Sequence, residues 1–202
     1  ARHGEHHERF FMELSAITEF LISLCFCSSC ISNFDSSGGN GTLLKAKVEK
    51  ALQPFLTEKD PWLDSPITKT ALAEILGSEI LDYLKVREAT LSGIYAEIFR
   101  IASKSGVEIS YVDQSTLLDM DSTTPLDLSW LVGIDPDLIA NCVSAFEPLV
   151  YRKSPAEVAA IYKHYVERLG MRLKPILRPT FPDNTDEKTL REKVAVLSKL
   201  GT

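Results

Sequence analysis

Cysteines are the most concentrated group of reactive side chains in this sequence. Cys25, Cys27 and Cys30 fall within six positions, and Cys142 stands alone. In a chain of 202 residues without a secretion signal, such clustering favours free thiols or a metal over disulfides. Thiolates bind zinc, and so do imidazoles, of which the start of the chain supplies three: His3, His6 and His7.

The spacing of the cysteines departs from the paired CxxC pattern of known zinc modules. On a continuous helix Cys25 would point away from Cys27, whereas Cys27 and Cys30 would share a face. We therefore expect no bound cofactor, with Cys25 buried in packing and Cys27 and Cys30 as ordinary thiols. The three histidines could equally form a hydrogen-bonded loop cluster. A bound zinc ion stays open as the alternative.

Carboxylates offer a second kind of chemistry. Glycoside hydrolysis uses two carboxyl groups about 5 to 10 Å apart, one of them as the acid. The available groups in loop-like stretches are Glu5, Glu8, Asp113 and Asp183. These side chains could equally cap helices or form ion pairs with arginines.

Arg178, which is followed by Pro179, is the main cationic candidate. Its guanidinium group could bind a substrate carboxylate or phosphate through two parallel hydrogen bonds, or it could form a salt bridge within the protein. No GxSxG motif is present, so nothing indicates a serine hydrolase.

Composition excludes several partners. The net charge is −6 and no run of Lys or Arg occurs, which argues against nucleic acid and anionic membrane surfaces. The most hydrophobic window, residues 20–26, is far shorter than the roughly 20 residues that cross a bilayer. The chain also begins without the pattern of a signal peptide. We expect a cytoplasmic protein with a small-molecule substrate.

The first half of the chain is predicted to be helical. Apolar residues at spacings of three and four predict helices over residues 11–27 and 42–55, the second capped by Thr42. The serine- and glycine-rich stretch 32–41 between them is predicted to be a surface loop. Residues 67–105 form a helical pattern too long for one ordinary helix, so we expect a break at Gly77 or within 86–90.

The second half alternates between β-rich runs and helices. Strands are predicted over residues 107–112, 143–150 and 173–177, and a short helix starts at Asp135-Pro136. Longer helices are predicted over 155–169 and from Asp186 to Leu200, each with capping signals. This alternation is typical of βα units in a parallel sheet.

Two short motifs carry a family resemblance. The segment His3-Gly4-Glu5-His6-His7-Glu8 is followed by Leu24-Cys25-Phe26-Cys27-Ser28-Ser29-Cys30. This pairing resembles uncharacterised bacterial (β/α)-barrel proteins, which are loosely similar in layout to glycoside hydrolases. The resemblance implies an α/β fold: the C-terminal half of a (β/α)8 TIM-type barrel with a helical insertion. Residues 1–202 would be a single domain, mainly helical over 1–105 and built of βα units over 106–202, and a fragment of a longer barrel.

A barrel places its chemistry on loops at the carboxyl ends of its strands. The resemblance then implies a site with Glu8, Asp113 and Arg178 as catalytic residues. Substrate-binding residues would be His3, His6, His7, Tyr151 and Asp183. One departure weakens this expectation, because the third strand ends in Arg178, where such hydrolases usually present a carboxylate.

Two interpretations of function stay open. The first is a hydrolase that acts on a carbohydrate-like small molecule through its loop carboxylates. The second is a noncatalytic scaffold or protein-binding module. In an incomplete barrel, uncovered strand edges and apolar faces would favour self-association.

Overall fold

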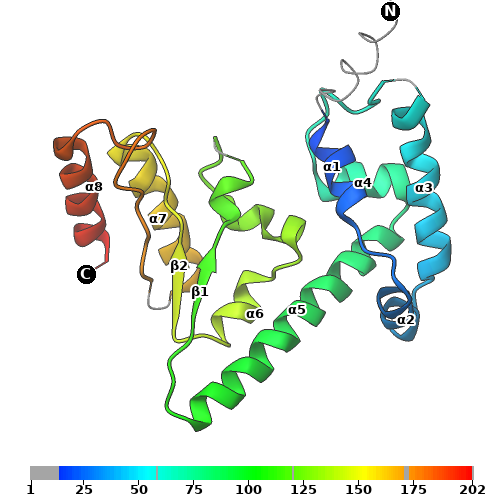
Figure 1. Cartoon of the computed structure of the whole chain (residues 1–202), viewed down its shortest axis with the longest axis horizontal. Coiled ribbons are helices and arrows are strands. Elements are labelled where there is room, and N and C mark those ends of the chain that lie inside the picture. Colours follow the sequence, from blue (N-terminus) through cyan, green and yellow to red (C-terminus); the bar gives the residue numbers. More distant parts are fainter. Residues whose placement is uncertain (1–13, 58, 120, 171–172, 202) are drawn as a thin grey trace, which may run out of the picture. The chain divides into compact units, whose positions relative to one another are not determined.

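The computed structural model describes residues 14–57, 59–119, 121–170 and 173–201 (Figure 1). The chain divides into two compact units, Ala1–Val86 and Arg87–Thr202, and the long helix α5 (Glu79–Lys104) belongs partly to each. The boundary between the units therefore falls within a helix. No single helix among the described residues is long and apolar enough to cross a membrane.

The regular secondary structure in the described part of unit 1 is all helical. It contains α1 (Ala16–Ser23), α2 (Ser28–Ser36), α3 (Gly41–Thr57), α4 (Lys69–Leu76) and the beginning of α5. Side chains from all five helices form its apolar core, which includes Ile17, Phe20, Leu21, Phe34, Leu44, Leu72, Ile80 and Tyr83.

The expected helix over residues 11–27 is shorter than predicted where it can be described. α1 ends at Ser23, whose hydroxyl donates to the carbonyl oxygen of Phe20 at 2.7 Å and so competes with the helical backbone. Leu24 is already extended, and α2 starts at Ser28 after a bend of 93°. Residues that were predicted to continue one helix instead form a short connection between two.

The predicted loop over residues 32–41 is wrong for its first half. α2 continues to Ser36 because Phe34 is buried against the ring of Tyr83, at 5.2 Å between ring centroids. The chain then turns at Gly38, which has a φ of 93°, and Asn40 accepts a hydrogen bond from the amide of Leu43 to cap α3. The predicted cap at Thr42 is therefore two positions too late.

The predicted break in the long helical pattern is confirmed at one of its two positions. α4 ends at Leu76 and α5 begins at Glu79, with Gly77 at a φ of 93° between them. Such a φ is accessible to glycine without strain, which explains the break.

Unit 2 contains two paired strands, β1 (Ser110–Asp113) and β2 (Ala145–Pro148). They are parallel, with Ser110 opposite Ala145 and Asp113 opposite Pro148. A third extended segment lies along the other edge of β2, where Leu173 and Ile176 form isolated parallel bridges. The three β-rich runs are thus parallel neighbours.

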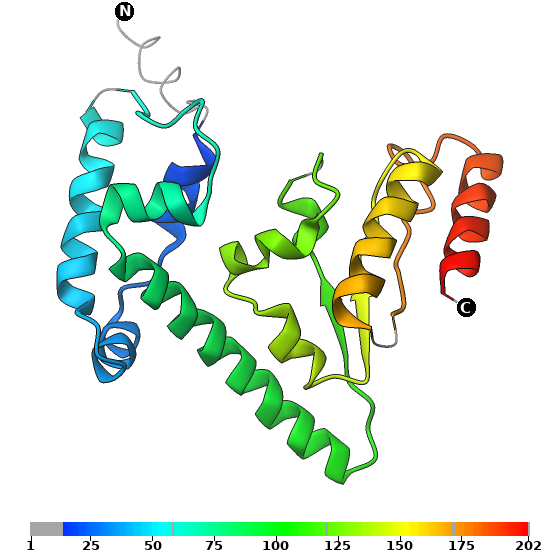
Figure 2. The ribbon, with the colours of Figure 1, turned by 180° about the vertical axis from the view of Figure 1, so that it is seen from behind.

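Helices cover this sheet. Figures 1 and 2 show α7 (Pro155–Leu169) against one face, with α8 (Glu187–Leu200) packed on α7. Two 3-10 helices, η2 (Ser115–Leu117) and η3 (Pro125–Val132), and the short helix α6 (Pro136–Ala140) connect β1 to β2. The core between sheet and helices is built from Leu126, Ile139, Phe146, Val158, Ile161 and Tyr165.

The partial TIM-type barrel is wrong for the described residues. They contain one two-stranded sheet and are otherwise mostly helical. The third segment also resists extension of the sheet. Lys174 and Ile176 donate their amides to β2, so Pro175 faces the opposite edge, where it has no N–H to offer. The predicted alternation of β-rich runs and helices is present in unit 2, but it does not form a barrel.

Candidate metal centre

Three thiols come together at the bend between α1 and α2. The sulfur atoms of Cys25, Cys27 and Cys30 all lie within 4.8 Å of one another. Those of Cys27 and Cys30 are 3.5 Å apart. Cys25 and Cys27 are exposed and Cys30 is half-buried. The expectation that Cys25 is buried and points away from Cys27 is therefore wrong.

Local backbone geometry explains why the thiols converge. Cys27 is the extended residue that precedes α2, and Cys30 is the third residue of that helix. Side chains at these two positions are neighbours, as in a capping box. α1 ends at Ser23, so Cys25 is not part of a helix. Its side chain is therefore not turned away from Cys27, as it would be on a continuous helix.

Contacts with α5 hold the connection in place. The ring of Phe26 stacks on Tyr83, with centroids 5.3 Å apart and an angle of 19° between planes. The Tyr83 hydroxyl donates a hydrogen bond to the carbonyl oxygen of Cys25. The apolar ring of residue 26 thus packs inward while the thiols on either side of it reach solvent.

The two closest thiols differ in acidity. The backbone amide of Cys30, followed by the thiols of Cys25 and Cys30, lowers the pKa of Cys27 to about 7. Burial, followed by hydrogen bonds from the neighbouring thiols, raises the pKa of Cys30 to about 12. Cys27 is therefore the thiol that ionises first near neutral pH, and thiolate is the form that binds metals.

The spacing of the sulfurs suits a thiolate-bound ion. A tetrahedral zinc site with bonds of about 2.3 Å places its sulfurs about 3.8 Å apart. The cluster, at 3.5 Å for one pair and within 4.8 Å for all, brackets that value. Among the described residues the group has three members, so it could bind a metal with a coordination position to spare. The three thiols are thus a group that could hold a metal ion.

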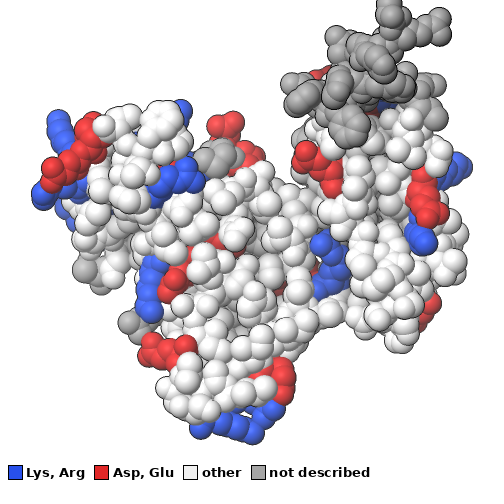
Figure 3. Space-filling model, viewed as in Figure 1, with Lys and Arg blue, Asp and Glu red and all other residues white. Residues whose placement is uncertain are grey.

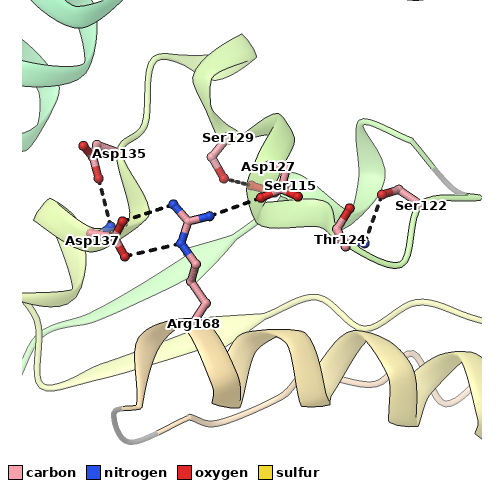
Figure 4. A network of polar contacts seen from close by, with 8 residues as sticks. All are labelled: Ser115, Ser122, Thr124, Asp127, Ser129, Asp135, Asp137 and Arg168. Carbon is pink, nitrogen blue, oxygen red and sulfur yellow. Dashed lines mark hydrogen bonds and ion pairs between the residues drawn. The ribbon is translucent and has the colours of Figure 1, made fainter. Parts of the chain in front are cut away.

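Asp113, a predicted catalytic residue, is enclosed at the end of β1. Its side chain is 0% exposed and accepts hydrogen bonds from the amide and hydroxyl of Ser115 and from the hydroxyl of Tyr165. Ser115 in turn lies 2.7 Å from the hydroxyl of Ser129, a contact drawn in Figure 4. Burial raises the pKa of Asp113. This carboxyl joins β1 to η2 and α7, Ser115 extends the network to η3, and no substrate could reach the carboxyl without opening that core.

Three other predicted site residues do come together. The guanidinium of Arg178 lies 4.4 Å from the centre of the Tyr151 ring, and its Nε is 3.3 Å from an oxygen of Asp183. Asp183 is only 5% exposed. The arrangement matches the alternative interpretation of Arg178, a salt bridge within the protein. Glu8, His3, His6 and His7 lie outside the described residues.

Sequence reasoning missed two buried cations among the described residues of unit 2. Lys193 of α8 is 0% exposed and donates to the carbonyl oxygens of Arg152 and Asp183 and to the amide oxygen of Asn184. Arg152 is 4% exposed and donates to the carbonyl oxygen of Thr116, among others. Lys193 does occupy the inward position of α8, between Leu190 and Leu197, which was the available signal.

Several surface charges of unit 2 form pairs of opposite sign. Arg168 of α7 contacts the carboxylates of Asp127 and Asp137, each at 3.1 Å (Figure 4). Over α8, acidic and basic side chains lie side by side (Figure 3), and Arg191 pairs there with Glu187. These exposed pairs satisfy one another and contribute little stability.

The chain matches no protein-family model, and neither the curated proteins nor the solved structures compared with it contain a match. Among the described residues, the thiol cluster has the most distinctive chemistry.

Proposed function

We propose that the chain binds one zinc ion through the thiolates of Cys25, Cys27 and Cys30. The observation that carries this proposal is the convergence of three sulfur atoms within 4.8 Å at an accessible bend. Soft thiolate ligands favour zinc over magnesium or calcium, which prefer oxygen.

Three protein ligands leave one position of a tetrahedral zinc ion for water or an incoming group. Zinc lowers the pKa of a bound water and polarises a bound carbonyl oxygen. An open, thiolate-held ion is consistent with the noncatalytic scaffold as well, where the fourth ligand would come from a binding partner. The ion would also fix the 93° bend between α1 and α2.

Hydrolysis of a carbohydrate-like substrate has less support and stays a prediction. It requires two carboxyl groups that face one cleft. Asp113 is enclosed, and Arg178 is already paired with Asp183.

Titration of the reduced, metal-free chain with Co²⁺ tests the proposal. Cobalt replaces zinc in thiolate sites and gives sulfur-to-metal charge-transfer absorption, which added Zn²⁺ should abolish at one equivalent per chain. Single serine substitutions at Cys25, Cys27 or Cys30 should weaken or remove the signal. Cys142→Ser, which changes a cysteine of unit 2, is the matched control and should leave it unchanged.

Loss of all three thiols without loss of the cobalt spectrum would overturn the proposal. A variant with His3, His6 and His7 replaced by alanine asks whether an imidazole is the fourth ligand. With water in that position, its spectrum should equal that of the wild type.

A further inference from the structure

The two closest sulfurs of the cluster are also arranged for redox chemistry. Cys27 Sγ and Cys30 Sγ lie 3.5 Å apart, compared with about 2.05 Å in a disulfide. The two residues precede and enter the first turn of α2, a helix of nine residues. Rotation of the two side chains can close the remaining gap, because neither thiol is fully buried.

The two thiols are unequal in access. Cys27 is exposed and lies where the free amides of the first turn of α2 favour a sulfur anion. Cys30 is half-buried, and its sulfur lies 3.5 Å from that of Cys27. This is the order needed for an attacking thiol and a resolving thiol.

We propose that Cys27 and Cys30 form a dithiol that exchanges with low-molecular-weight disulfides such as oxidised glutathione. In the first step the Cys27 thiolate attacks one sulfur of the disulfide, forms a mixed disulfide, and releases the other half as a thiolate. In the second step the Cys30 thiol gives its proton to that thiolate or to water. Its sulfur then attacks Cys27, and the second half leaves. The protein loses two electrons and two protons, and the small disulfide becomes two thiols.

The third cysteine of the cluster is anchored through its backbone. The carbonyl oxygen of Cys25 accepts a hydrogen bond from Tyr83, and the next residue, Phe26, is stacked on the same ring. Oxidation of Cys27 and Cys30 would leave Cys25 as the sole thiolate of the cluster. On the proposed function, on which this one consequence rests, oxidation would therefore release the zinc ion.

Mass spectrometry of the metal-free, reduced chain in glutathione redox buffers tests the exchange. The expected product is an intramolecular disulfide between Cys27 and Cys30, located by peptide mapping and reversed by reduced glutathione. In Cys30→Ser the resolving sulfur is missing, so the glutathione adduct on Cys27 should accumulate about tenfold over wild type. Cys25→Ser and the matched control Cys142→Ser should still form the disulfide.

A disulfide that maps to Cys25 or Cys142, or a Cys30→Ser variant that accumulates no adduct, would overturn the proposal. Far-ultraviolet circular dichroism of each variant shows whether the helices persist. Since the exchange is measured without metal, it can succeed when zinc binding fails. Zinc binding by the reduced chain, conversely, survives a failure of the exchange.

Discussion

Lys193 Nζ donates a 2.6 Å hydrogen bond to the carbonyl oxygen of Asp183, ten residues earlier in the chain. Two further bonds, to the carbonyl oxygen of Arg152 at 2.7 Å and to Oδ1 of Asn184 at 2.8 Å, use the other protons of the ammonium group. One fully buried cation thus ties α8 to the segment after β2 and to the turn before α8 itself.

Replacement of this lysine by methionine should destabilise unit 2. Lys193→Met keeps most of the side chain's length but removes the ammonium donor from three buried oxygens, at a cost of about 2 to 4 kcal/mol. Lys188→Met on the same helix, where the side chain is 87% exposed, should change stability by less than about 0.5 kcal/mol. Urea unfolding followed by circular dichroism gives both values. Equal effects would show that Lys193 is not a structural anchor.

Asp113 should make stability fall as the pH rises. Burial raises its pKa in the folded chain, so the native state holds the proton more tightly than the unfolded state. Its contribution is complete below the unfolded pKa of about 4 and is lost progressively above it. The unfolding free energy of wild type relative to Asp113→Asn should therefore decrease from pH 4 toward pH 7. A difference that is constant or that grows with pH would contradict the assignment.

Substitution by alanine should have opposite effects on stability at two glycines. A Cβ on Gly39 would collide with the buried ring of Phe34, so Gly39→Ala should cost about 1 to 3 kcal/mol. Gly93 lies inside α5 with open space around it, and Gly93→Ala should stabilise the helix by about 0.5 to 1 kcal/mol. Thermal unfolding of the two variants checks the signs. Stabilisation by Gly39→Ala would mean that Phe34 packs elsewhere.

Zinc should stabilise the chain by an amount that grows with the logarithm of its free concentration above the dissociation constant. An ion that binds only the folded form adds about 2.7 kcal/mol at a free concentration a hundredfold above its dissociation constant. The gain should vanish in Cys27→Ser and persist in Cys142→Ser, as measured by thermal shift with and without a chelator. The same shift in both variants would place the ion at another site.

The hydroxyl of Tyr83 should affect metal affinity without touching the ion. Tyr83→Phe keeps the stacked ring but removes the donor to the carbonyl oxygen of Cys25. Loss of such outer support typically weakens metal binding at least tenfold, so we expect about that change in zinc competition. Tyr95→Phe, whose ring lies edge-on to Tyr111 in unit 2, is the control. An unchanged affinity in Tyr83→Phe would show that the connection needs no anchor.

Helix ends with local signals were predictable from sequence. Ser154, Pro155 and Glu157 form the capping box that begins α7, and Gly170 ends that helix with a φ of 56°, as predicted. Asp186 likewise caps α8. These signals act within a few residues, so they need no knowledge of the rest of the fold.

Features set by distant contacts were not predictable. The apolar run from Phe20 to Phe26 continues a helical pattern, yet the helix ends early and Phe26 packs on Tyr83, far along the chain. This contact brings Cys25 toward the other thiols, and no local spacing encodes it. Strand alternation predicted the parallel pairing in unit 2 but could not fix the number of strands.

Parallel pairing of β1 with β2 has a kinetic consequence. Residues 114–144 must close a loop before the first hydrogen bond of this sheet can form. The chain loses the entropy of that closure before the contacts between the strands can stabilise it. In unit 1 the helices α2, α3 and α4 contact their neighbours in sequence, which requires shorter loops. Refolding from urea should thus proceed in two phases, with the thiol-bearing unit acquiring its structure ahead of the sheet.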